Sequence, residues 1–373
     1  MRSAGLRVIA GKEFNDHLRS RKFHLIFGIF LVIAAVGLIS GAVEYQKQID
    51  DYNSMQQAAQ DDGFMEKSYY SWKPTILSAF TEMSMLMTTI GVILGIAMGF
   101  DLITKEKESR SLKILLSHPI YRDEVINGKA LGGVAAIALA MGIMLVLSLA
   151  VILLFGIVPD FEEIVRMLLF GVLSFLLVFS FFAIALFMST VAKDSGSAII
   201  YTLIVMIVLS SLLPVFTYGS VYTAVFGQPP EPPESDMMYF SGQGTTVVSR
   251  AVEIVDGEGM PEPVVDEAWQ EYEEKSRAYW ERRQAVGEAV SLLSPTNNYQ
   301  RLAYAVTNPG MARMMLSSSS YSVVEMEDEI PQEGFSALFS LLGEMATNIA
   351  ALIITPALFF GLAWVRFMRE DVR

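Results

Sequence analysis

Apolar and polar residues alternate in long blocks along the chain. Six of the apolar blocks contain about 20 residues or more, which is long enough for a helix to cross roughly 30 Å of hydrocarbon. They extend over residues 23–43, 74–100, 130–158, 164–192, 198–216 and 335–364. The pattern therefore predicts an all-α multi-pass membrane protein with six transmembrane helices.

The polar blocks predict the parts that lie outside the hydrocarbon. Residues 1–22 are basic and carry apolar side chains at three- and four-residue spacing, which is typical of an amphipathic helix lying along a membrane surface. A solvated basic tail is the alternative interpretation. Between the spans lie an external loop at 44–75, a charged segment at 100–129 and a large polar segment at 218–334.

The distribution of charge predicts the orientation in the membrane. Basic residues concentrate in 1–22, in 100–129 and after the last span, whereas the turn at 159–163 and the segment 218–334 are acidic. Lys and Arg accumulate on the cytoplasmic side of membrane proteins. We therefore expect a cell-membrane protein with both termini in the cytoplasm and a large acidic domain outside. The predicted organisation is a cytoplasmic helix at 1–22, five spans within 23–217, an external domain at 218–334, and a sixth span with its tail at 335–373.

The segment 218–334 gives mixed secondary-structure signals. β-branched residues around 244–255 and 321–326 predict short strands, whereas 266–293 and 300–306 show helical apolar spacing. Aromatic residues are frequent here, so we expect a folded, mixed α/β external domain between the fifth and sixth spans.

Composition narrows the class of function. The chain is 53% hydrophobic and 18% charged, with a mean hydropathy of +0.43 and a net charge of -13. It contains no cysteine, which excludes disulfides, thiolate metal sites and cysteine nucleophiles. The zinc motif HExxH, the phosphate loop GxxxxGK(S/T) and the nucleophile motif GxSxG are also missing from the sequence. We therefore expect no catalytic site and no metal or cofactor bound by this chain.

The segment 100–129 is the long charged insert between the second and third predicted spans. An apolar stripe with helical spacing lies within it, formed by Leu112, Leu115, Leu116 and Ile120. Pro119 is expected to end or bend this helix. Because apolar side chains are not expected to face water without a partner, the stripe predicts a docking surface for another protein. The alternative is a basic loop that only fixes the topology.

Three charged residues fall inside predicted spans, namely Glu82, Arg166 and Glu344. A charge at mid-membrane costs roughly 2.5–3.5 kcal/mol on insertion scales, so such residues usually face a partner or a water-filled path. Two interpretations stay open: a polar lining for a substrate path, or a structural pair of Arg166 with Glu82 or Glu344. A third interpretation is that these side chains simply snorkel toward the interface.

The charged segment also carries a recognisable order of residues. It reads EKESRSLKILLSHP over 106–119, and it continues with Arg122 and a Gly-Lys pair at 128–129 that leads into the third span. This order resembles the cytoplasmic signature of ABC-2-type transporter permeases. Arg110 stands where that family often has a glycine.

Two further segments resemble the same family. KEF at 12–14 and RSRK at 19–22 look like its N-terminal elbow helix, and SPTNNY at 294–299 looks like its external Ser-Pro segment. The chain is similar to permeases that serve nitrous oxide reductase maturation and to sodium- or drug-export permeases.

The resemblance implies a mechanism that needs a partner. Permeases of this family lack a nucleotide site and pair with cytoplasmic ABC ATPase subunits, usually as a permease dimer, so that ATP and Mg bind to the partner. The first cytoplasmic insert is their coupling helix, which docks on the ATPase with charge pairs at its rim. By this resemblance, the ATPase-coupling residues are Glu106, Glu108, Arg110, Ser111, Leu112, Leu115, Leu116, Pro119, Arg122 and Lys129.

We therefore expect the permease subunit of an ATP-driven ABC exporter, acting as a homodimer or heterodimer in a lipid bilayer without any nucleic acid partner. The alternative is a membrane-anchored sensor or assembly factor whose acidic external domain binds a partner or ligand.

Overall fold

The structure is a computed structural model, and it describes residues 2–61, 74–111, 121–215, 220–233, 238–242, 245–249, 267–309, 312 and 334–370. The chain forms two compact units, which are described separately below. The larger unit consists of Met1–Leu212 together with Ser291–Arg373, and the smaller unit consists of Leu213–Val290.

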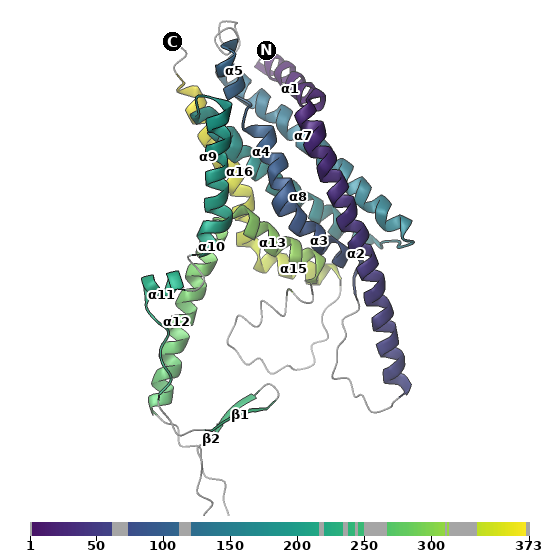
Figure 1. Cartoon of the computed structure of the whole chain (residues 1–373), viewed down its shortest axis with the longest axis vertical. Helices are drawn as coiled ribbons and strands as arrows, with labels where there is room; N and C mark the ends of the chain where they lie inside the picture. Colours follow the sequence, from purple (N-terminus) through teal and green to yellow (C-terminus); the bar gives the residue numbers. More distant parts are fainter. Residues whose placement is uncertain are drawn as a thin grey trace, which may run out of the picture. The chain divides into compact units, whose positions relative to one another are not determined.

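The described part of the larger unit is built from helices (Figure 1). In chain order they are α1 (Arg2–Arg19), α2 (Arg21–Asp61), η1 (Ile76–Ser78), α3 (Ala79–Leu86), η2 (Met87–Gly91), α4 (Val92–Gly99), α5 (Thr104–Glu108), α7 (Arg122–Leu154), α8 (Phe161–Val191), α9 (Ser195–Ile207), η3 (Val208–Leu212), α13 (Pro295–Thr307), α15 (Phe335–Glu344) and α16 (Ala346–Met368).

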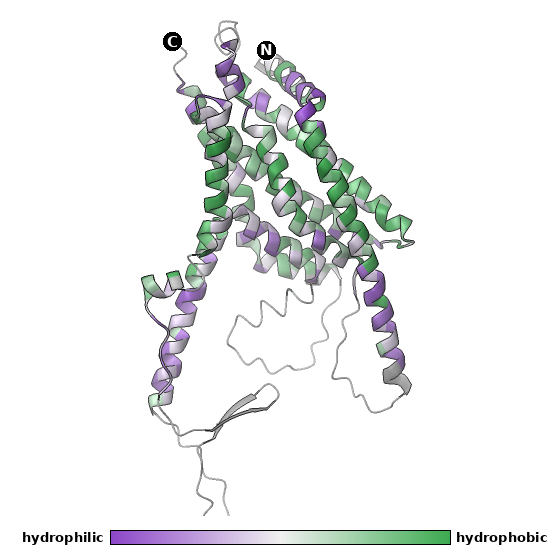
Figure 2. Ribbon diagram, viewed as in Figure 1, coloured by the Kyte–Doolittle hydropathy of each residue, from purple (hydrophilic) through white to green (hydrophobic). Residues whose placement is uncertain are grey.

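Six of these helical stretches are long and apolar enough to cross a membrane, which confirms the prediction of six spans. They are Arg21–Gln57, Ile76–Glu108, Arg122–Leu154, Phe161–Val191, Ser195–Leu212 and Ala346–Met368. Figure 2 shows hydrophobic residues along these helices and hydrophilic residues near their ends.

The first and the last spans differ most from the prediction at their boundaries. α2 continues through the polar residues 44–61, so its 41 residues extend for about 60 Å, roughly twice the hydrocarbon thickness. The last apolar block is divided at Met345, and only α16 after this break is long enough to span. Sequence periodicity could not locate the break, because both halves are apolar and no proline or glycine stands at Met345.

Acidic residues begin two of the spans. Asp160 precedes α8 and accepts a hydrogen bond from the backbone N–H of Glu163 at 2.8 Å, while Glu163 accepts one from the Asp160 N–H at 2.9 Å. This reciprocal capping box satisfies N–H groups that the first turn leaves free. Asp194 caps α9 in a similar way, and the hydrogen bonds from Ser197 hold the pKa of its carboxyl below the usual value.

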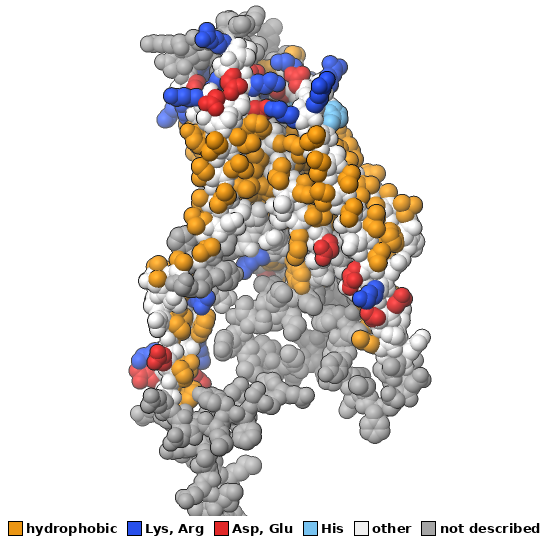
Figure 3. Space-filling model, in the orientation of Figure 1, with side chains coloured by type: hydrophobic (Ala, Val, Ile, Leu, Met, Phe, Trp, Pro, Cys, Tyr) orange, Lys and Arg blue, Asp and Glu red, His pale blue; other side chains and the backbone are white. Residues whose placement is uncertain are grey.

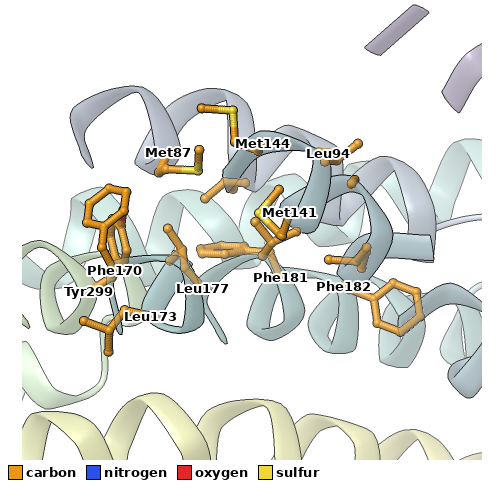
Figure 4. Close-up of a cluster of buried hydrophobic side chains, with 14 of the residues drawn as sticks. Met87, Leu94, Met141, Met144, Phe170, Leu173, Leu177, Phe181, Phe182 and Tyr299 are labelled. Atoms are coloured by element: carbon orange, nitrogen blue, oxygen red, sulfur yellow. The ribbon is translucent and has the colours of Figure 1, made fainter. Parts of the chain in front are cut away.

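The centre of the larger unit is α8, which packs against α4, α7, α9, α13 and α16. Leu177, Phe181 and Phe182 of α8 are completely buried, and Figure 4 shows them among the methionine and aromatic side chains of the core. Gly99 of α4 lies so close to α8 that a Cβ there would be 2.6 Å from the Phe182 carbonyl oxygen. Small residues of this kind allow helices to approach closely inside a membrane, where burial of apolar surface does not drive association.

A neutral polar network fixes α13 inside the larger unit. The Tyr299 hydroxyl lies 3.0 Å from the Ser174 hydroxyl of α8, and the Asn348 side chain of α16 donates to Asn298 Oδ1 at 2.8 Å. Burial raises the pKa of Tyr299 above its usual range, so the hydroxyl stays protonated. We call Ser174, Asn298, Tyr299 and Asn348 the α13 network.

The position of α13 corrects the predicted domain boundaries. The short helix expected at 300–306 exists, but it begins at Pro295 and packs on α8 and α16 instead of belonging to a separate domain at 218–334. Ser294 caps its first turn, and proline is favoured at the first helical position.

The smaller unit does not support the mixed α/β domain that we expected. Its described residues form α10 (Leu213–Val215), α11 (Ser220–Phe226), most of α12 (Glu267–Leu292) and one antiparallel hairpin of β1 (Met238–Gly242) and β2 (Thr245–Ser249). The long helix predicted at 266–293 is confirmed by α12, and β2 falls within the predicted 244–255 strand. Two paired strands are too few for a sheet with its own core. The strand expected at 321–326 lies outside the described residues.

Candidate functional site

Charged side chains gather at the end of the larger unit where both termini lie (Figures 1 and 3). We call this end the terminal face; it is formed by α1, α5, the first two turns of α7, the start of α9 and the last turn of α16. Figure 3 shows Lys, Arg, Asp and Glu side chains here, next to a band of hydrophobic side chains that covers the spans. Most of the described residues of the charged segment 100–129 belong to this face.

A buried lysine lies at the centre of the terminal face. Lys129 of α7 is 3% exposed, and its Nζ lies 2.5 Å from Glu13 Oε1 of α1 and 2.7 Å from Glu106 Oε1 of α5. We call these three residues the lysine triad. A buried ammonium group needs such partners because the loss of water would otherwise be costly. The triad therefore joins three helices through one side chain.

Glycines on α7 bring α1 close enough for this contact. A Cβ at Gly132 would lie 2.8 Å from the Ala10 carbonyl oxygen and 3.0 Å from the Phe14 nitrogen, and a Cβ at Gly128 would lie 2.8 Å from Ile9. The two glycines are four residues apart and thus lie on one face of α7. The N-terminal helix predicted at 1–22 is present as α1. Because Gly128 and Gly132 have no side chain to separate α7 from α1, Glu13 of α1 reaches Lys129.

The start of the charged segment is also fixed to the turn between α8 and α9. Glu108 Oε1 accepts a hydrogen bond from the Ser195 N–H at 2.6 Å. Lys107 Nζ donates to the carbonyl oxygens of Thr190 at 2.7 Å and Ala192 at 3.2 Å. Glu106 and Glu108, for which the resemblance implied charge pairs with a partner protein, are thus engaged inside this chain.

Arg122 connects the start of α7 with the end of α16. Its Nη1 donates to the carbonyl oxygen of Glu370 at 2.7 Å, and the Glu370 carboxylate lies 3.1 Å from Lys107 Nζ. Arg122 is therefore also engaged within the chain. Glu370 was not among the predicted site residues, although it lies in the charged tail that follows the last span.

Arg110 adopts the backbone conformation that favours glycine. Its φ is 55°, and it is the one described residue other than glycine with a positive φ. Residues with a side chain rarely adopt this backbone conformation, whereas glycine adopts it readily. This conformation suits the glycine that the resemblance to ABC-2 permeases implies at this position. Ser111 follows, with its hydroxyl 2.8 Å from that of Ser109. Four predicted coupling residues, Leu112, Leu115, Leu116 and Pro119, lie outside the described residues, as does Ile120 of the same stripe.

A cavity of about 240 Å³ lies beside the lysine triad, lined by side chains of α1, α2, α4, α5 and α7. His17 of α1 contributes to its wall, and burial lowers the pKa of this imidazole below 6.5 although Glu13, Asp101 and Asp16 act in the opposite direction. The Nε2 atom of His17 is buried and has no hydrogen-bond partner among the described residues.

The three charges predicted inside spans are not brought together. Arg166 is buried and donates from Nε to Glu162 Oε1 at 3.0 Å, one turn earlier on α8, so the expected pair with Glu82 or Glu344 is not formed. Glu82 and Glu344 are exposed and form no ion pair with any described residue. Glu344 ends α15 and thus lies outside the candidate span. The substrate-path interpretation stays a prediction.

Comparison with known families now identifies the chain at the family level. The model of the ABC-2 family transporter proteins matches residues 7–372. The chain belongs to this family. It is also 26% identical over 194 residues to the probable ABC transporter permease protein NosY of Pseudomonas aeruginosa, a match that covers 51% of this chain and 62% of that relative. The matched region is thus less than two thirds of the relative's length.

Membership of the ABC-2 family confirms the resemblance of the motifs and agrees with the six candidate spans. ABC-2 permeases are the membrane subunits of transporters and are not themselves catalytic. In the part of the chain that the structure describes, no group of three or more His, Asp or Glu side chains is arranged to hold a metal ion.

Proposed function

We propose that this ABC-2 protein is the permease subunit of an ATP-driven exporter and that a separate cytoplasmic ATPase binds at its terminal face. The observation that carries the proposal is the lysine triad, which connects α5, the start of the segment that resembles a coupling helix, to α1 and to the membrane helix α7. A force applied to this segment would thus reach the spans directly. The name of the Pseudomonas aeruginosa relative supports the same class of function.

The division of work between the subunits follows from the sequence. ATP and Mg bind to the partner, because this chain has no phosphate loop. The apolar stripe within 112–120 docks on the ATPase, and closure of the ATPase moves α5, which transmits the motion to the spans. Both termini and the segment 100–129 then lie in the cytoplasm, and the acidic segment 218–334 lies outside. Two permeases, identical or different, form the transport path.

The docking step is tested by co-purification with an ATPase that is encoded next to this chain. Leu115→Asp and Leu116→Asp place a charge in the apolar stripe, so we expect both variants to lose the complex. Leu115→Met keeps an apolar side chain and serves as the matched control. If both Asp variants retain the ATPase and its stimulation, the coupling assignment is wrong.

The orientation is tested by labelling single cysteines, which the cysteine-free chain makes simple. Ser109→Cys lies on the terminal face and Val158→Cys lies in the exposed connection between α7 and α8. An impermeant maleimide should label the first in inside-out vesicles and the second in intact cells. The reverse pattern would contradict a cytoplasmic terminal face.

The alternative function is a membrane-anchored sensor whose external part binds a partner. Such a protein would not change the activity of an ATPase. ATP hydrolysis by the reconstituted complex, measured with and without candidate substrates, distinguishes the two functions and also identifies the substrate.

A further inference from the structure

The lysine triad contains one carboxylate more than Lys129 needs. Lys129 carries one formal positive charge, whereas Glu13 and Glu106 carry two formal negative charges. One carboxylate is enough to keep the buried ammonium group paired. The opening of most buried ion pairs is costly because it leaves a buried charge unpaired. Here Lys129 stays paired when either acid moves away, because the other acid remains.

The two carboxylates are held with different firmness. Glu13 belongs to the 18-residue helix α1, whose backbone is in close contact with Gly128 and Gly132 of α7. Glu106 belongs to the five-residue helix α5, its side chain is more exposed than that of Glu13, and its Oε2 is buried without a hydrogen-bond partner among the described residues. Glu106 thus belongs to the shorter helix and is the more exposed of the two acids, so α5 is more easily displaced from Lys129 than α1 is.

The surroundings of α5 allow movement on one side and restrain it on the other. The cavity beside the triad is lined by Lys12 of α1 and by Glu106 and Ser109, so α5 does not pack directly on α1 here and little packing opposes their separation. On its other side, α5 is held by Glu370, which contacts Lys107 and also accepts a hydrogen bond from Arg122. The hydrogen bonds of Lys107 and Glu108 to the turn between α8 and α9 hold it there as well.

We propose that the Glu106–Lys129 ion pair is a releasable latch that positions α5 against α7, while the Glu13–Lys129 pair stays closed. When the latch opens, α5 turns away from α1 and α7 about its contacts with Glu370 and with the turn between α8 and α9. Glu13 keeps Lys129 paired throughout. This inference rests on the proposed function only where it assigns the opening to the ATPase cycle; the latch itself belongs to the permease alone.

The first experiment uses the permease alone, in detergent or nanodiscs. Spin labels at Lys12→Cys and Ser109→Cys report the separation of α1 and α5 by pulsed electron paramagnetic resonance, and no native cysteine interferes. Glu106→Gln should shift the distances to longer values, because the neutral amide holds Lys129 less strongly. Glu13→Gln is the matched control: it removes the other acid of the same lysine, so the distances should stay as in the parent. Glu106→Asp should restore most of the short distances.

Two results of this experiment would overturn the latch: equal distances in Glu106→Gln and the parent, or an equal shift in both glutamine variants. The melting temperature of each variant is measured in parallel. If both glutamine variants melt at a lower temperature than the parent, a longer distance reflects general loosening of the fold and not release of the latch.

The second experiment adds the ATPase partner. In the parent complex, ATP should shift the distances toward those of Glu106→Gln, and in Glu106→Gln they should no longer respond to nucleotide. If the ATPase binds but ATP leaves the parent distances unchanged, the latch is not part of the cycle and the proposal fails. If no ATPase binds to the chain, the proposed function fails, and the first experiment still decides whether the latch exists.

Discussion

The lysine triad and the α13 network are two buried polar clusters at opposite ends of the larger unit, and they differ in charge and in the number of spare partners. Each joins three helices: α1, α5 and α7 in one case, and α8, α13 and α16 in the other. The triad is ionic and has one acceptor more than its lysine needs. The α13 network is neutral, and each of its side-chain amides has a specific partner.

This difference implies different mechanical roles. A buried neutral network loses hydrogen bonds whenever one member moves, so it holds its helices in one arrangement. An ionic cluster with a spare carboxylate can exchange one arrangement for another without leaving its cation unpaired. We therefore expect the α13 end to be the fixed end of the unit and the terminal face to be the adjustable end.

The largest effect is expected from Lys129→Met. This change leaves two buried carboxylates side by side without a counter-charge, which should lower the free energy of unfolding by about 3–5 kcal/mol. Tryptophan fluorescence during thermal unfolding in detergent measures the loss. Lys105→Met removes an exposed lysine of the same segment and is the matched control. Equal melting temperatures for the two variants would show that the triad does not contribute to the stability of the folded protein.

Asn298→Ala tests the neutral cluster. Asn298 is completely buried, accepts from Asn348 and donates to the Leu292 carbonyl oxygen at 2.8 Å. Its removal leaves buried groups without partners and should cost about 2–3 kcal/mol. The neighbouring Asn297 is only partly buried, so Asn297→Ala should cost much less. Glu106→Gln should lose much less stability than Asn298→Ala, because Glu13 still pairs with Lys129 in that variant. This difference separates the adjustable end from the fixed end.

Gly132→Ala tests whether close packing keeps Glu13 in the triad. The added methyl group would meet the backbone of α1 at Ala10 and Phe14, so α1 must move away from α7, at a cost of about 1–2 kcal/mol. Gly142→Ala on the same helix meets no atom within 4 Å and should be neutral or slightly stabilising. Similar melting temperatures for both alanine variants would contradict a close α1–α7 contact.

The sequence predicted the spans far better than it predicted these clusters. Long apolar blocks identify membrane helices because the hydrocarbon thickness sets their length. Glu13 and Lys129 are separated by 116 positions, and nothing in either local pattern indicates that they meet. Their contact depends on tertiary packing, namely on Gly128 and Gly132, which read as ordinary small residues in an apolar helix. For the same reason SPTNNY at 294–299 was assigned to an external domain, although its polar groups are satisfied inside the larger unit.

The smallest expected effect is a pH dependence that His17 gives to the adjustable end. Burial lowers the pKa of His17 below 6.5, so the folded state favours the neutral imidazole. The unfolded chain binds this proton more readily, and the contribution of His17 to stability is therefore complete above about pH 6.5 and declines as the pH falls below it. Glu13 and Asp16 of α1 and Asp101 after α4 favour the charged form, whereas burial and Lys129 oppose it.

His17→Gln removes this titration, so its melting temperature should fall less between pH 7.5 and 5.5 than that of the parent. His24→Gln, which replaces an exposed histidine four residues into α2, controls for the loss of an imidazole. Carboxylates titrate in both variants alike, so the difference between them isolates His17. A parent-like slope in His17→Gln would show that folding does not lower the pKa of His17, so that Glu13, Asp16 and Asp101 offset the effect of its burial.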